Sequence, residues 1–291
     1  MNQFKTLALL ALLSGLLVGM GYLLIGGTNG ILIGLALAAV SNLGSWYFSD
    51  KIALRAYQAQ PVSRQQAPAL YASVEKLSQA AEIPMPDVYI IPTEAANAFA
   101  TGRNPNNAAV AVTQGLMNML TQEELEGVLG HELSHIINRD TLTQAVAATI
   151  GGAVSSLAYM AQWASYSRGG QGDRRGGNPL GLLLAVFLAP LAATLIQMGI
   201  SRTREFAADA GAGQLTQNPR ALMSALRKLE KSAQVAPMGG NPSFEPMLII
   251  NAFSREGLSN LFSTHPSTEE RIERLEAQAQ GLLQSTPILN R

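Results

Sequence analysis

The chain has 291 residues, a formal net charge of zero and 14% charged residues, against roughly 25% in soluble domains. The balanced charge lacks the basic excess typical of nucleic-acid binding, so we expect no nucleic-acid partner. There is no cysteine, which excludes disulfides and thiolate catalysis and limits any metal site to His, Asp and Glu ligands.

The first 50 residues predict a transmembrane hairpin. Residues 7–25 and 30–48 carry no charge, and each run is close to the ~20 residues that cross a bilayer as a helix. A cleaved signal peptide is disfavoured because the second apolar run follows the first at once. Lys5 before the hairpin, and Lys51 and Arg55 after it, predict that both flanks are cytoplasmic.

A second hydrophobic pair is predicted over residues 141–201. Its cores, 143–164 and 180–200, are long enough to span, which would bring the total to about four transmembrane helices. The alternative is a pair of buried or partly embedded helices. The basic loop at 168–178 opposes the positive-inside rule if the pair crosses, so the sequence leaves the crossing open.

Residues between the two pairs predict a helix followed by a small antiparallel sheet. Residues 66–81 have an amphipathic helical pattern, and the segments "DVYIIP", "ANAFATG" and "NAAVAVTQG" have strand character. An exposed strand edge can bind an extended peptide by backbone pairing. We expect Asn97, Ala98 and Phe99 to form such a substrate-binding edge, through their backbone more than their side chains.

A helix is predicted to begin at Thr121, where Glu124 completes a capping box. It carries the motif "HELSH", which places His131 and His135 on one face, one turn apart. Two such imidazoles can bind one Zn²⁺, and Glu132 beside them can take a proton from an attacking water.

A catalytic zinc site needs a third protein ligand, which is either His265 or a carboxylate. The segment "RTREFAAD" offers Glu205 and Asp209 on one helix face. Glu205 could ligate the metal, and Asp209 could accept a hydrogen bond from a ligand histidine. The alternative is that both carboxylates pair with Arg202 and Arg204 on a solvated face.

The C-terminal part of the chain is predicted to be helical. The "RTREFAAD" helix is expected to continue from the preceding hydrophobic run, and another helix opens at Asn218-Pro219. Residues 234–246 are expected to form an exposed loop. Ser267 and Glu270 predict a second capping box, with a helix running to about Leu283. The resulting segments are 1–50, 51–140 with the "HELSH" helix, 141–201, and 202–291.

The order "HELSH", hydrophobic pair, then Glu205-x-x-x-Asp209 resembles the membrane-bound M48 zinc metalloproteases, and among them the HtpX proteases of bacterial inner membranes. "NAFATG" and "STHPSTEERIERL" are similar to segments of the same family. The resemblance implies a zincin-type domain, mainly α with a small antiparallel sheet (α+β), combined with about four transmembrane helices. It also implies one Zn²⁺ per chain held by His131, His135 and Glu205, with Glu132 as general base.

The resemblance further implies that His265 donates to the developing oxyanion; alternatively it is a loop histidine that caps local backbone. Arg271 either organises the site through carboxylates or lies on a solvated helix face. The implied function is a multi-pass endopeptidase of the bacterial inner membrane that cleaves membrane or misfolded proteins in quality control. Its active site would face the cytoplasm, and the 141–201 pair must return the chain to the side it left, because His135 and Glu205 share one metal.

Two other functions stay open at this point. One is a catalytically inactive zinc-binding scaffold, which a closed four-ligand site including His265 would favour and Glu132 argues against. The other is a CaaX-type prenyl-protein protease, which would require a larger intramembrane chamber than about four transmembrane helices can form. The pattern specifies neither an oligomeric state nor individual substrates.

Overall fold

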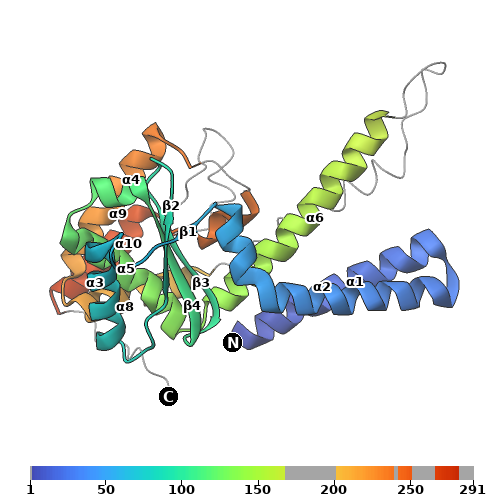
Figure 1. Ribbon diagram of the computed structural model, residues 1–291, viewed down its shortest axis with the longest axis horizontal. Coiled ribbons are helices and arrows are strands. Elements are labelled where there is room, and N and C mark those ends of the chain that lie inside the picture. Colours follow the sequence, from blue (N-terminus) through green and yellow to red (C-terminus); the bar gives the residue numbers. More distant parts are fainter. Residues whose placement is uncertain (1, 168–200, 239–241, 251–265, 282–291) are drawn as a thin grey trace.

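The computed structural model describes residues 2–167, 201–238, 242–250 and 266–281. A rounded body holds the sheet, and the hairpin of α1 and α2 extends from it, as does the long helix α6 (Figure 1). The elements in chain order are α1 (Asn2–Ile25), α2 (Gly27–Ala56), β1 (Gln60–Pro61), α3 (Pro68–Ala80), β2 (Asp87–Ile91), β3 (Ala98–Asn104), β4 (Asn107–Thr113), α4 (Gln114–Met119), α5 (Gln122–Ile137), α6 (Thr141–Ser167), α8 (Arg202–Thr216), α9 (Pro219–Val235), the 3₁₀ helix η1 (Pro242–Met247) and α10 (Thr268–Ala279).

The sheet has four strands in the order β1-β2-β4-β3. The hairpin of β3 and β4 is antiparallel, as expected, but β2 and β4 pair in parallel, so the sheet is mixed and the prediction of a purely antiparallel sheet was wrong. The reason is that β4, rather than β3, docks beside β2. This order leaves β3 as an edge strand of the sheet.

Both faces of the sheet are buried, because helices cover each of them (Figure 1). Alternate strand residues point to opposite faces: Ala98 and Ala100 join the cluster formed with α3, α5 and α9, whereas Phe99 joins the cluster formed with the end of α2 and the start of α6. Tyr57 packs against Phe99, with ring centroids 5.4 Å apart. The edge strand is therefore fixed from both sides.

Helix α5 begins with the predicted capping box. The Thr121 side chain accepts from the backbone N–H of Glu124, and the Glu124 carboxylate accepts from the N–H of Thr121. Two glycines on α5 allow its neighbours to approach closely. A Cβ on Gly127 would lie 2.9 Å from the backbone nitrogen of Leu222 in α9, and one on Gly130 would lie 3.2 Å from the Cα of Ala212 in α8.

Other expectations had mixed outcomes. The helix opening at Asn218-Pro219 is confirmed, with the Asn218 side chain accepting from the N–H of Ala221. Helix α8 does not continue from the preceding run, because Ser201 is extended and α8 starts anew at Arg202. Residues 234–246 are not simply an exposed loop, because α9 continues to Val235 and η1 buries Phe244 in the core.

Within the described residues, one helix, α2, is long and apolar enough to cross a membrane, with a mean hydropathy of 1.6, and Phe4–Gly19 in α1 forms a shorter apolar stretch. Much of α2 presents apolar side chains to its surroundings, including Leu32, Leu37 and Val40. The fourth expected span, 180–200, lies outside the described residues. The total of about four spans stays a prediction.

The start of α6 lies against both the hairpin and the body. Thr143 and Thr6 are joined through their hydroxyls at 3.0 Å, which ties the beginning of α6 to the beginning of α1. Asp140, just before α6, lies 3.8 Å from Arg204 in the first turn of α8, measured from Oδ1 to Nε. The chain thus returns next to the point where it left, as sharing one metal requires.

The close packing at Gly127 gives a test of the body's architecture. We expect Gly127→Ala to lower the free energy of unfolding by about 1–3 kcal/mol, because the added methyl meets rigid backbone. The steric conflict must outweigh the ~1 kcal/mol that alanine gains over glycine in a helix. Thermal unfolding in detergent measures the change. The matched control is Gly44→Ala in α2, where the added Cβ meets no atom within 4 Å; equal effects would contradict the packing.

Candidate metal centre

Two packed helices build the candidate site. His131, Glu132 and His135 lie on α5 with exposures of 1%, 2% and 4%, and Glu205 in the first turn of α8 is equally buried. Burial of so many ionisable groups is costly unless they pair with one another or with a metal. The small residues where α5 and α8 meet bring Glu205 up to the two histidines.

The donor atoms of His131, His135 and Glu205 converge on one point, all lying within 4.8 Å of one another. The two Nε2 atoms are 3.2 Å apart, and each lies 3.6 Å from one oxygen of Glu205. Tetrahedral zinc with bonds of 2.0–2.1 Å separates its ligand atoms by about 3.3 Å. The three donors therefore have the spacing of three ligands of a tetrahedral zinc site.

A carboxylate orients each histidine from behind. The Nδ1–H of His131 donates to Asp209 at 2.9 Å, which is the contact expected for Asp209. The Nδ1–H of His135 donates to Asp140 at 3.2 Å, a partner that sequence reasoning missed. The sequence signal for this contact is an aspartate five residues after His135, just past the end of α5. With both Nδ1 atoms protonated, both Nε2 lone pairs point to the shared centre.

Convergent lone pairs and a carboxylate need a cation between them. Without one, two imidazole acceptors 3.2 Å apart repel each other. Burial lowers the pKa of His131, but hydrogen bonds with Asp209 and Glu205 outweigh that effect and raise it to about 9. The site therefore attracts positive charge, whether as a proton or as a metal, and its His₂Glu donor set suits zinc.

Arg271 in α10 completes the support of His131. Its Nε and Nη2 donate to the two oxygens of Asp209 at 2.8 and 2.7 Å, and all of these groups are almost fully buried. Burial opposes the charged guanidinium, but the carboxylate of Asp209 outweighs it and raises the pKa of Arg271 further. Arg271 Nη2 also lies 3.3 Å from His131 Nδ1, but both atoms are donors, so we assign the bond to Asp209.

Glu132 lies beside the metal-binding atoms. Its Oε1 is buried and has no hydrogen-bond partner within the part of the chain that the structure describes, which is unusual for a buried carboxylate. Burial raises the pKa of Glu132, whereas the two histidines and the nearby backbone amide of Ala100 in β3 lower it. An unsatisfied oxygen at a site that can hold a metal fits a carboxylate that receives a water.

The remaining predicted site residues differ in their surroundings. Asn97, Ala98 and Phe99 are fully buried at the edge strand β3, and Phe99 packs its ring away from the metal atoms into the opposite cluster. His265 lies outside the described residues. The structure thus brings together His131, Glu132, His135, Glu205, Asp209 and Arg271.

The family model for peptidase family M48 matches residues 64–279, which include every residue of the cluster. The chain belongs to peptidase family M48. It is therefore a metalloprotease, a hydrolase of peptide bonds that depends on a metal.

Relatives with the name "Protease HtpX homolog" match this M48 chain over nearly its whole length. The one from Trichormus variabilis is 63% identical over 276 residues, covering 94% of this chain and 96% of the relative. The one from Pyrococcus furiosus is 50% identical over 272 residues, covering 93% and 94%. The crystal structure of Ste24p from S. mikatae shares the fold, with a TM-score of 0.50 and 20% identity, and this chain spans 65% of its length.

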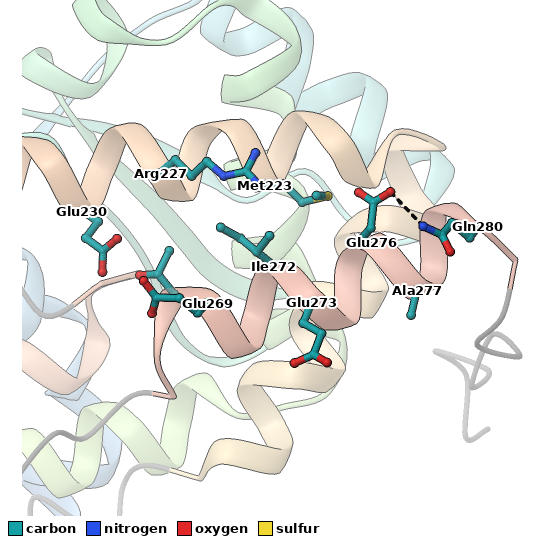
Figure 2. A pocket seen from close by; sticks show the side chains of 10 residues that line it. Met223, Arg227, Glu230, Glu269, Ile272, Glu273, Glu276, Ala277 and Gln280 are labelled. Atoms are coloured by element: carbon teal, nitrogen blue, oxygen red, sulfur yellow. Dashed lines mark hydrogen bonds between the residues drawn. The ribbon is translucent and has the colours of Figure 1, made fainter.

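A hollow on the surface of this M48 protein lies between α9 and α10 (Figure 2). Arg227 and Glu230 line it from α9, and Glu273 and Glu276 from α10. None of its lining residues belongs to the metal cluster, so the hollow is not the catalytic cleft.

The contact between Asp140 and His135 predicts an effect on metal binding. We expect Asp140→Ala to weaken zinc binding about 10–100-fold, because His135 loses the partner that fixes its orientation. Competition with a chromophoric chelator measures the affinity. Asp50→Ala, at an acidic position near the end of α2, is the control and should bind zinc as wild type does. Unchanged affinity in Asp140→Ala would show that His135 needs no such support.

Proposed function

We propose that this M48 protein is a zinc endopeptidase in which His131, His135 and Glu205 hold one Zn²⁺. The observation that carries the proposal is the convergence of their three donor atoms beside the buried carboxylate of Glu132. A Zn²⁺ held by these three residues would supply Lewis-acid chemistry, which polarises a peptide carbonyl and makes water easier to deprotonate.

Glu132 acts as the general base in this proposal. Its carboxylate takes a proton from the water that attacks the peptide carbonyl carbon, and later returns that proton to the leaving amine nitrogen. Asp209 and Asp140 keep Nδ1 of His131 and His135 protonated, so that both Nε2 atoms remain ligands. Arg271 holds Asp209 in place through two hydrogen bonds. His265 is proposed to donate to the oxyanion of the tetrahedral intermediate.

The proposed setting is the bacterial inner membrane, with a multi-pass chain and the active site facing the cytoplasm. The apolar exterior of α2 and the basic residues that flank the hairpin support this setting. The proposed substrates are membrane or misfolded proteins, bound as extended chains along the edge strand β3. Backbone pairing at an edge demands little of the side chains, which suits a quality-control protease.

The role of Glu132 is tested by Glu132→Gln. We expect cleavage of an unfolded protein such as β-casein to fall by about 10²–10⁴-fold, because the glutamine cannot accept the proton. The variant should still bind one zinc per chain. Glu126→Gln, at a position on the same helix that pairs with Lys76 at the surface, should cleave at the wild-type rate. Cleavage by Glu132→Gln at the wild-type rate would overturn the mechanism.

The ligand role of Glu205 calls for a direct measurement of metal content. We expect Glu205→Ala to lose most of its zinc on dialysis against a mild chelator, because two histidines alone remain. The matched control is Glu230→Ala in α9, at a hollow outside the metal cluster, which should keep one zinc per chain. Full zinc in Glu205→Ala, measured by mass spectrometry of the metal, would remove Glu205 from the ligand set.

A further inference from the structure

The segment Leu248–Ile250, which follows η1, lies along the free edge of β3. The backbone N–H of Ile249 donates to two acceptors there, the carbonyl oxygen of Ala98 at 3.2 Å and Oδ1 of Asn97 at 3.1 Å. The carbonyl oxygen of Ile249 accepts from Nη1 of Arg271 at 2.7 Å. The N–H of Ile249 is therefore bound at the sheet edge, and its C=O is bound by Arg271.

Along β3, every second residue turns its backbone N–H and C=O groups away from β4, toward the free edge of the sheet. Because the N–H of Thr113 bonds to the carbonyl of Asn97, it is Ala98, Ala100 and Gly102 that turn their backbone groups away from β4. Glu132 lies near the backbone amide of Ala100, two residues from the place where Ile249 bonds to Ala98. Ile249 thus occupies the edge next to the proposed general base.

Arg271 connects the same residue to the metal cluster. Its guanidinium donates to the carbonyl oxygen of Ile249 on one side and to Asp209 on the other, and Asp209 bonds to His131. The carbonyl of Ile249 is therefore three hydrogen bonds away from a proposed zinc ligand. An extended peptide bound at this edge would need the same acceptors and the same donor.

We propose that Ile249 occupies the place of one substrate residue, so that the segment Leu248–Ile250 competes with substrate at the active site. This inference rests on the proposed endopeptidase function and adds regulation to it. The Ile249 side chain is 1% exposed and belongs to the apolar cluster that also contains Leu133 and Leu275. A substrate residue that replaces Ile249 must therefore be bulky and apolar, and an acidic residue there would be rejected.

Hydrogen exchange tests the displacement without altering the segment. Zinc-loaded Glu132→Gln protein is mixed with an unstructured ten-residue peptide carrying a central isoleucine. We expect the amide of Ile249 to exchange faster when the peptide binds, because its two acceptors are taken. A peptide with a central aspartate is the matched control and should bind at least tenfold more weakly. Binding of the isoleucine peptide without faster exchange at Ile249 would overturn the proposal, as would equal binding of the two peptides.

Kinetics of Ile249→Pro give an independent test. Proline lacks the N–H, so the variant cannot donate to Asn97 and Ala98. We expect KM for the isoleucine peptide to fall by about tenfold with little change in kcat, because the competitor no longer holds the edge. Val235→Ala, at the exposed end of α9, is the control and should keep the wild-type KM. A raised KM or a lost activity in Ile249→Pro with one zinc still bound would identify the segment as part of the substrate-binding floor and contradict the proposal.

The two proposals fail in different ways. If wild-type enzyme with one zinc per chain does not cleave β-casein or the isoleucine peptide, the endopeptidase function fails and the competitor role fails with it. If the peptide is cleaved in a Glu132-dependent manner and Ile249 stays protected, only the competitor role fails.

Discussion

The structure depends on one electrostatic constraint: two imidazole nitrogens and a carboxylate meet inside the protein with their lone pairs facing one another. Such an arrangement is unfavourable unless a cation lies at the centre and each ligand is held from behind. Asp209 and Asp140 provide that hold for His131 and His135. The parts of the chain that carry these carboxylates, α8 and the link between α5 and α6, are thereby fixed relative to each other.

The same constraint explains how distant parts of the chain are arranged. Glu205 and Asp209 belong to α8, which follows the second hydrophobic run, so α6 must leave the body beside the place where α8 enters it. The 3.8 Å contact between Asp140 and Arg204 lies at that junction. Arg271 brings α10 to Asp209 and, through its third nitrogen, brings the segment after η1 to the edge of β3. The metal cluster, the edge strand β3 and helix α10 are therefore linked to one another through Arg271.

Much of this site follows from sequence, because its parts depend on local spacing. The i, i+4 placement of His131 and His135, the cap at Thr121 and the pair Glu205 and Asp209 are all properties of single helices. The parallel pairing of β2 with β4 does not follow, because tertiary packing decides which strand of the hairpin lies beside β2. The placement of Ile249 is likewise tertiary, since it has no periodic pattern in the sequence, whereas the contact of Asp140 with His135 is local and depends on the turn just after α5.

The central claim, an open His₂Glu metal centre, is tested most directly by zinc K-edge X-ray absorption on the purified chain with one zinc bound. The account predicts two imidazole nitrogens and oxygen donors at about 2.0–2.2 Å, with a spectrum that changes when a peptide hydroxamate binds. A closed shell with three imidazoles that is insensitive to the hydroxamate would contradict it and would favour a structural metal in place of a catalytic one.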